Sequence, residues 1–455
     1  MNRVRGWPKT RLRAGGNRSA KVAPGALLLL VFVGLLLSRQ DASSLRTPAL
    51  ADSRAVAANF VFFYQRIDPA RDAPKFRGAK AVVIAGAQDD GSAISAVHRA
   101  GALAVRYVEL YWLPAGRSYE GIDIGRHLDW AFCSRGDSPL LGRLVNGVQW
   151  YFFDANERAA HRALFRYLRA LKGLGYDGIF VDRGTPSLRS SRGINIAWRE
   201  STCTADPVSR THRRFADVYA AVVKEAKQRL GLRVYINYGH PFSHPRLRPD
   251  PQDRSCRQPG RSGCHYLDDL NRALSGVIDE SVNNVNTPSG FAVEMKLDAA
   301  ESQAVTAGQP PAIRGIKVLA GQKDEAFMRW STAHLFNLST FINTGDDGCS
   351  VGACNRNGTY PQLTSAKLGA PLSAAPRATS CVVPHSDQCL WIRAYTGGVV
   401  TVNASAQPIT QSIDLHGDCA RVLDVYNGDW SRGCERSFDA RLPSHSGRLF
   451  LTTPE

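Results

Sequence analysis

Two carboxylate residues close short apolar segments of the sequence, at positions where a side chain could do chemistry. Asp182 ends the segment 175–182 (GYDGIFVD), and Glu280 ends the segment 276–280 (GVIDE). A carboxylate at the end of a buried strand is held with little freedom, which suits a nucleophile that attacks an anomeric carbon. A partly desolvated glutamate keeps its proton until a leaving oxygen needs it. The pair predicts hydrolysis of a glycosidic bond, with Asp182 as nucleophile and Glu280 as acid/base.

Each of these two assignments has a structural alternative. An aspartate at a strand end can cap the turn that follows, which would explain Asp182 without any chemistry. Side chains alternate along a strand, so only one of Asp279 and Glu280 can face a given side. We choose Glu280 because it lies nearer the end of the strand.

Polar and aromatic residues at the ends of other apolar segments are candidates for substrate binding. Sugar hydroxyl groups need fixed donors and acceptors, and sugar rings stack on aromatic faces. The candidates are Tyr64, Arg106, Glu109, Asn237, Tyr238 and Asp346.

Short β-rich segments alternate with helical ones from residue 52 to residue 365, which is typical of a parallel α/β fold. We expect a (β/α)8 TIM barrel with helices over 157–172, 211–230 and 324–335. The expected strands are 60–64, 81–85, 103–108, 177–182, 233–237, 276–280, 316–320 and 339–343. A further apolar segment, 148–153, is interpreted as an excursion after the third strand, although it could also be counted as a barrel strand.

The pattern changes towards the C-terminus. Residues 366–379 are rich in Ala, Pro and Ser and are interpreted as a linker. From 380 to 455, short alternating segments separated by turns such as 427–429 predict a small antiparallel β-sandwich. The fold class is therefore α/β, a TIM barrel followed by a β-sandwich.

The N-terminal 51 residues resemble an export signal. A basic stretch without acidic residues precedes the apolar run 26–37, which is too short to cross a bilayer as a helix. We expect a cleaved signal peptide or an N-terminal membrane anchor, and an exported protein in either case. The membrane is expected as a partner only through this segment. Residues 1–51 carry +8 of the formal net charge of +17, and the remaining +9 is spread along the chain. We find no basic cluster that contains aromatic residues, so we expect no nucleic-acid partner.

Ten cysteines in an exported chain predict disulfides. The close couples are Cys256/Cys264, Cys349/Cys354, Cys381/Cys389 and Cys419/Cys434, which leaves Cys133 and Cys203. Zinc is the alternative, but there is no C-x2-C repeat and the histidines are not grouped with the cysteines. We expect no metal and no cofactor.

The segments 175–182, 236–237 and 277–281 resemble the hypothetical glycosyl hydrolase family 15 group. They are also similar to the endo-α-1,4-polygalactosaminidase family and, more distantly, to the α-galactosidase clan. The segments 391–403 and 446–451 resemble the β-domains that follow such barrels. The resemblance implies a TIM-barrel hydrolase of α-linked saccharides with a retaining mechanism, its nucleophile at Asp182 and its acid/base at Glu280. One departure is Arg183-Gly184, where those families commonly carry a small polar residue or a second carboxylate.

Two other functions are also compatible with the sequence. The chain could be a surface lectin that keeps the barrel cleft for binding alone, or a transglycosylase that builds polymer. The separation of the two carboxyl groups is a further test, because about 5–5.5 Å predicts retention and about 6.5–9.5 Å inversion.

Overall fold

The chain divides into a short N-terminal unit, Met1–Asp52, and a larger unit, Ser53–Glu455. The computed structural model describes residues 57–63, 66–85, 91–110, 112–115, 122–132, 139, 141–145, 147–182, 215–237, 273–279, 288–306, 309–316, 321–346, 356–357, 360–382, 386–415 and 419–454. The predicted signal or anchor, 1–51, lies outside these residues. Among the helices that are described, none has both the length and the apolar character needed to span a membrane.

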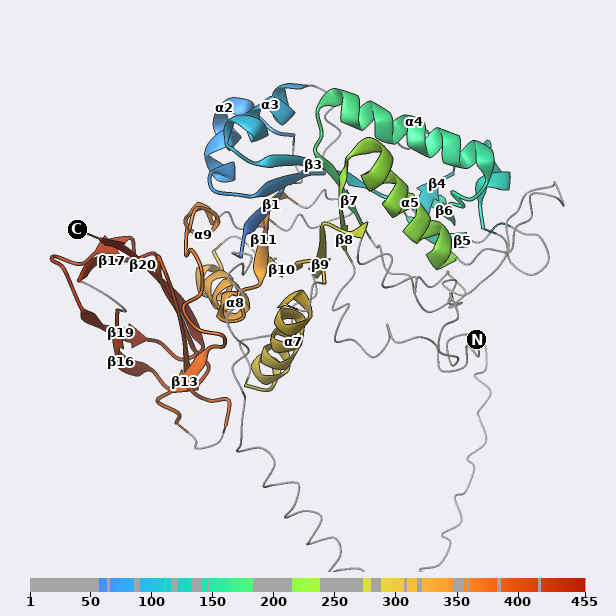
Figure 1. The fold of residues 1–455 in the computed structure, drawn as a ribbon. Coiled ribbons are helices and arrows are strands. Elements are labelled where there is room, and N and C mark those ends of the chain that lie inside the picture. Colours follow the sequence, from blue (N-terminus) through green and yellow to red (C-terminus); the bar gives the residue numbers. More distant parts are fainter. Residues whose placement is uncertain are drawn as a thin grey trace, which may run out of the picture. The chain divides into compact units, whose positions relative to one another are not determined.

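Within the described residues, eight parallel strands close into a barrel, which confirms the predicted fold class (Figure 1). Their order is β1-β2-β3-β7-β8-β9-β10-β11, and β1 pairs with β11 to complete the ring. The strands are β1 (Asn59–Phe63), β2 (Ala81–Ile84), β3 (Leu103–Val108), β7 (Gly178–Val181), β8 (Arg233–Asn237), β9 (Gly276–Asp279), β10 (Ala312–Ile316) and β11 (Ser339–Asp346). A short strand, β12 (Arg356–Asn357), pairs antiparallel with the end of β11.

Helices connect these strands along the chain. They are α2 (Pro69–Asp72), α3 (Gly91–Arg99), α4 (Arg158–Leu174), α5 (Phe215–Leu230), α7 (Pro288–Thr306), α8 (Lys323–Leu335) and α9 (Pro361–Thr364), with 3-10 turns η1 (Ala73–Phe76) and η2 (Leu128–Trp130). Helix α4 begins where the Glu157 carboxylate accepts hydrogen bonds from the backbone N–H groups of Ala159 and Ala160. It ends at Gly175, whose φ of 101° is left-handed and favours glycine.

The predicted excursion after the third strand is confirmed. Strands β4 (Trp112–Pro114), β5 (Leu141–Val145) and β6 (Val148–Phe152) form a separate antiparallel sheet in the order β4-β6-β5. The apolar segment at β6 is therefore not a barrel strand. It belongs to a small sheet inserted between β3 and α4.

The seventh barrel strand was predicted too far towards the C-terminus. The expected segment was 316–320, whereas β10 runs from Ala312 to Ile316 and pairs with β9 and β11. The reason is Arg314, which interrupts the apolar pattern of this strand. Its charge is buried against carboxylates outside the barrel, so a position that looks unsuitable for a strand is part of one.

The barrel interior is filled by side chains from alternate strands, as is usual for TIM barrels. Two rings of four belong to one apolar cluster. One ring comes from β1, β3, β8 and β10 (Phe60, Val105, Tyr235 and Ile313), and the next comes from β2, β7, β9 and β11 (Val83, Phe180, Ile278 and Phe341). Residues of opposite parity, such as Val82, Ile179 and Val277, face the helices in a second cluster.

The C-terminal strands form the predicted antiparallel β-sandwich. One sheet has the order β13-β14-β15-β20-β17-β18 and the other pairs β16 with β19. The strands are β13 (Arg377–Thr379), β14 (Leu390–Tyr395), β15 (Gly398–Asn403), β16 (Ile409–Asp414), β17 (Ala420–Asp424), β18 (Asp429–Trp430), β19 (Ser437–Leu442) and β20 (Ser446–Pro454). The segment predicted as a linker, 366–379, contains β13 and the buried residue Leu368.

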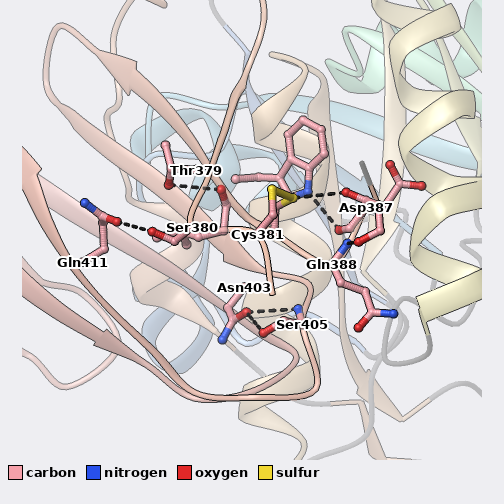
Figure 2. Close-up of a disulfide and its surroundings, with 12 residues drawn as sticks. Thr379, Ser380, Cys381, Asp387, Gln388, Asn403, Ser405 and Gln411 are labelled. Atoms are coloured by element: carbon pink, nitrogen blue, oxygen red, sulfur yellow. Dashed lines mark hydrogen bonds between the residues drawn. A yellow bond between two sulfur atoms is a disulfide. The ribbon is translucent and has the colours of Figure 1, made fainter. Parts of the chain in front are cut away.

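Two of the predicted disulfides, both in this sandwich, are confirmed. Cys381 bonds Cys389, and Cys419 bonds Cys434. Figure 2 shows the first of them beside Ser380, whose hydroxyl donates to Oε1 of Gln411. The other six cysteines lie outside the described residues.

Candidate active site

Asp182 follows directly after β7, at the carboxyl end of the barrel strand. Its backbone N–H donates to Val108 O at 3.1 Å, which extends the pairing with β3 by one residue. The side chain is half-buried and lies two residues beyond Phe180, on the inward-facing side of the strand. The sequence thus placed this carboxylate correctly at the open end of a barrel strand.

Two donors from neighbouring strands hold the Asp182 carboxylate. The hydroxyl of Tyr107 on β3 donates to Oδ2 at 2.6 Å, and the Nδ2 amide of Asn237 on β8 donates to Oδ1 at 3.0 Å. The two oxygens therefore accept hydrogen bonds from different strands, which fixes the plane of the carboxylate. Asp182 is consequently held by side chains from two neighbouring strands across the barrel end.

Glu109 is a second carboxylate near Asp182. Its Oε1 lies 3.4 Å from the Tyr107 hydroxyl, which at 2.6 Å is closer to Asp182. The single phenolic proton is therefore directed mainly at Asp182. The structure brings three of the residues singled out in the sequence, Asp182, Glu109 and Asn237, around a tyrosine that sequence reasoning missed.

Arg106 lies away from this group. It shares the outward parity of Ala104 and Val108, is only 5% exposed, and donates from Nη1 to Ile84 O at 3.3 Å. Its neighbour Tyr107 faces the barrel interior instead. Alternation along the strand was the only signal in the sequence that could have identified Tyr107. Alternation alone does not show which of the two sets of side chains faces the barrel interior.

For four predicted site residues the structure describes no side chain. Glu280, Tyr64 and Tyr238 lie outside the described residues, as does the side chain of Asp346, which is the last residue of β11.

Asp279, the competitor of Glu280, faces away from the barrel interior. Its Oδ2 accepts a hydrogen bond from Nη1 of Arg314 at 2.7 Å, and Arg314 also reaches Asp298 on α7 at 2.5 Å. Both are almost fully buried between the barrel and α7. Burial alone would lower the pKa of Arg314, but the carboxylates of Asp298, Glu294 and Asp279 outweigh it and raise the pKa. Asp279 thus belongs to a buried ion cluster behind the barrel wall.

Among the described residues, no group of three or more His, Cys, Asp or Glu side chains is arranged to hold a metal ion. The chemically active group that the structure describes is the hydrogen-bonded carboxylate of Asp182 at the carboxyl end of the barrel. Such a group can act as a nucleophile, as a base or as a ligand for hydroxyl groups.

No protein-family model matches the chain, and no curated protein sequence matches it. Solved structures do match. The α-amylase from H. orenii is 10% identical, with 88% of this chain and 100% of that chain covered and a TM-score of 0.50. A noncanonic maltogenic α-amylase from Thermotoga neapolitana is 10% identical, with 87% of this chain and 99% of that chain covered and a TM-score of 0.48. A GH27 β-L-arabinopyranosidase from Geobacillus stearothermophilus is 11% identical, with 88% of this chain and 98% of that chain covered and a TM-score of 0.47.

The likeness to the H. orenii structure shows that the two chains share a fold. At so low an identity it shows nothing finer, because one barrel fold carries many chemistries.

Proposed function

We propose that this protein is an exported glycoside hydrolase that cleaves α-linked poly- or oligosaccharides with two carboxylates, Asp182 and Glu280. The observation that carries the proposal is the Asp182 carboxylate, held at the carboxyl end of a closed barrel by hydrogen bonds from Tyr107 and Asn237. In TIM-barrel enzymes this end of the barrel is where active sites are built. Since both partners donate, the arrangement suits an ionised carboxylate.

In the proposed reaction Asp182 is the nucleophile. An Asp182 oxygen attacks the anomeric carbon while the Glu280 carboxyl gives its proton to the leaving glycosidic oxygen. The bond from carbon to that oxygen breaks, and a glycosyl ester of Asp182 forms. Glu280 then takes a proton from water, whose oxygen displaces Asp182 and releases the sugar with its anomeric configuration retained.

The assignment of Glu280 is supported by the alternation of β9. Ile278 faces the barrel interior and Asp279 faces the helices, where Arg314 binds it. A strand that continues this alternation turns the next residue inward. Asp279 is bound in its own ion cluster, so of the two neighbouring carboxylates we assign Glu280 to the site.

Export is supported by the N-terminal sequence and by the disulfides. Bonds such as Cys381–Cys389 and Cys419–Cys434 form and persist in oxidising compartments. The apolar run 26–37 supplies a segment of the kind that directs export.

The test is to screen the purified protein against a panel of α- and β-linked polysaccharides, with reducing-end release as readout. Asp182→Asn and Glu280→Gln should each lower kcat by orders of magnitude, and Asp182→Asn should still bind the saccharide. The matched control is Asp177→Asn, which changes an aspartate at the opposite end of the same strand, where it binds His98 and the backbone N–H of Ala104.

The products separate the proposal from its competitors. NMR of the first products should show the retained anomer, and the inverted anomer would contradict the double-displacement scheme. Binding without any turnover would identify a lectin. Longer products that appear only with an acceptor sugar would identify a transglycosylase.

A further inference from the structure

Asn343 is a buried amide in the barrel wall that has no hydrogen-bond partner among the residues that the structure describes. It lies on β11 and is 1% exposed. Neither Nδ2 nor Oδ1 makes a hydrogen bond to any residue in the described part of the chain. Leaving a buried polar group unsatisfied is costly, so an asparagine at this position calls for a physical explanation.

The barrel geometry places Asn343 in the same ring of inward-facing side chains as Asp182. Phe180 and Phe341 belong to one ring of the interior, and their ring centroids lie 6.1 Å apart. Asp182 and Asn343 are each two residues further along the same strands, β7 and β11, towards the carboxyl end. Side chains two residues apart lie on the same side of a strand. Asp182 and Asn343 therefore both face the barrel interior, one layer closer to its carboxyl end than Phe180 and Phe341.

Asn343 pairs with Phe62 on β1, whereas the described members of its own ring besides Asp182 are small. Ala85, which packs at the edge of the interior cluster, is two residues beyond Val83 on β2 and contributes only a methyl group to the ring of Asp182 and Asn343. Gly315 on β10 is paired with Phe341 and contributes no side chain at all. Asp182 is therefore the polar group that lies across the barrel from the Asn343 amide in the same ring.

A purely structural asparagine in the same barrel behaves differently. Asn59, on β1 at the amino end, donates to Leu363 O and Thr364 O and accepts from Trp330 and Thr340. Its amide is fully used in holding α8 and α9 against the barrel. Asn343 has no such function within the described residues.

We propose that Asn343 is a substrate-binding residue of the barrel site. Its amide holds a donor and an acceptor side by side, which match two neighbouring hydroxyl groups of the sugar ring whose anomeric carbon faces Asp182. This inference rests on the proposed function, and it adds a specificity determinant opposite the nucleophile. It predicts a preference for sugars that carry a free vicinal diol on the side away from Asp182.

The test is Asn343→Leu, which keeps the volume of the side chain and removes both hydrogen-bonding atoms. In the ligand-free protein Tm should rise by about 2 °C or more, because an unsatisfied amide is replaced by an apolar group. In an Asp182→Asn background, the affinity for an oligosaccharide that the wild-type protein hydrolyses should fall about tenfold or more by calorimetry. Asn59→Leu is the matched control and should lower Tm.

Two results would overturn the inference. A fall in Tm for Asn343→Leu comparable to that of Asn59→Leu would mean that the amide is structural. An unchanged oligosaccharide affinity would mean that the amide is satisfied by buried water alone and does not touch the sugar.

The proposed function can fail separately from this inference. If the wild-type protein binds and cleaves no saccharide of the panel, the hydrolase proposal is overturned. The Tm comparison then still decides: a rise assigns Asn343 to a site for another polar ligand, and a fall overturns its role as a ligand residue.

Discussion

The phenolic oxygen of Tyr107 lies 2.6 Å from Oδ2 of Asp182, across the pairing of β3 with β7. The two residues are far apart in the sequence and meet because their strands are neighbours in the barrel. A hydrogen bond of this length to a carboxylate is of the strong, charge-assisted kind. Together with Asn237, Tyr107 therefore orients the Asp182 carboxylate.

Removing this hydroxyl should impair turnover more than binding. For Tyr107→Phe we expect kcat to fall about tenfold, because one charge-assisted hydrogen bond to the nucleophile is lost, with little change in KM. Steady-state kinetics on the substrate found in the polysaccharide screen measure both. Tyr235→Phe, a buried interior tyrosine two residues before Asn237, is the control and should leave kcat unchanged. Equal kcat for Tyr107→Phe and the wild type would refute the orienting role.

The ion cluster of Arg314 should be important for stability. Arg314 is 2% exposed and lies within 2.7 Å of Asp279, 2.5 Å of Asp298 and 3.7 Å of Glu294. Arg314→Met leaves these carboxylates buried without their cation and should lower the free energy of unfolding by about 3–5 kcal/mol at pH 7. Chemical denaturation monitored by tryptophan fluorescence measures the change.

A paired substitution separates burial from the mere loss of a salt bridge. Arg329→Met breaks a partly exposed i,i+4 pair with Glu325 and should cost less than about 1 kcal/mol. Equal losses for the two variants would show that the Arg314 cluster contributes no more than a surface pair.

His334 should make the protein less stable in mild acid. Its ring lies 3.7 Å from that of Trp330 between ring centroids, and neither ring nitrogen has a hydrogen-bond partner among the described residues. Burial, together with the charge of Arg393, lowers its pKa from 6.5 to about 3. Between these values the unfolded chain binds a proton that the folded chain does not, so stability falls as pH decreases, by about 1.4 kcal/mol per pH unit below 6.5.

The measurement is urea denaturation at pH 7.0 and pH 5.0 for the wild type and for His334→Phe, which keeps an aromatic ring against Trp330. The wild type should lose about 2 kcal/mol more than the variant over this interval. The same loss in both proteins would show that His334 is not the group responsible.

The longer of the two described disulfides should contribute measurably to stability. Cys419 and Cys434 are separated by 15 residues in the sequence, and closing a loop of this length is worth about 3 kcal/mol. Cys419→Ala/Cys434→Ala should lower the free energy of unfolding by that amount, measured by chemical denaturation under oxidising conditions. A reducing agent should shift the wild type towards the variant and should change the variant less.

The sequence alone determined the barrel, the inserted strand and the sandwich, because apolar periodicity reports local structure directly. It also located Asp182 at a strand end, and it paired Cys381 with Cys389 and Cys419 with Cys434 from their closeness along the chain. These features depend on residues that are close in the sequence, so a sequence pattern is sufficient to predict them.

Only the tertiary structure decided which side of each strand faces the interior. Both faces of a parallel barrel strand are apolar, so the sequence favoured Arg106 where the structure turns Tyr107 inward. Asn343 was not predicted from the sequence as a site residue. The strand that contains Arg314 was predicted too far towards the C-terminus, because a buried charge is stable only when its partners on another element are in place. Closure of the barrel fixes the stagger of the strands, and that stagger brings Tyr107, Asp182 and Asn237 together.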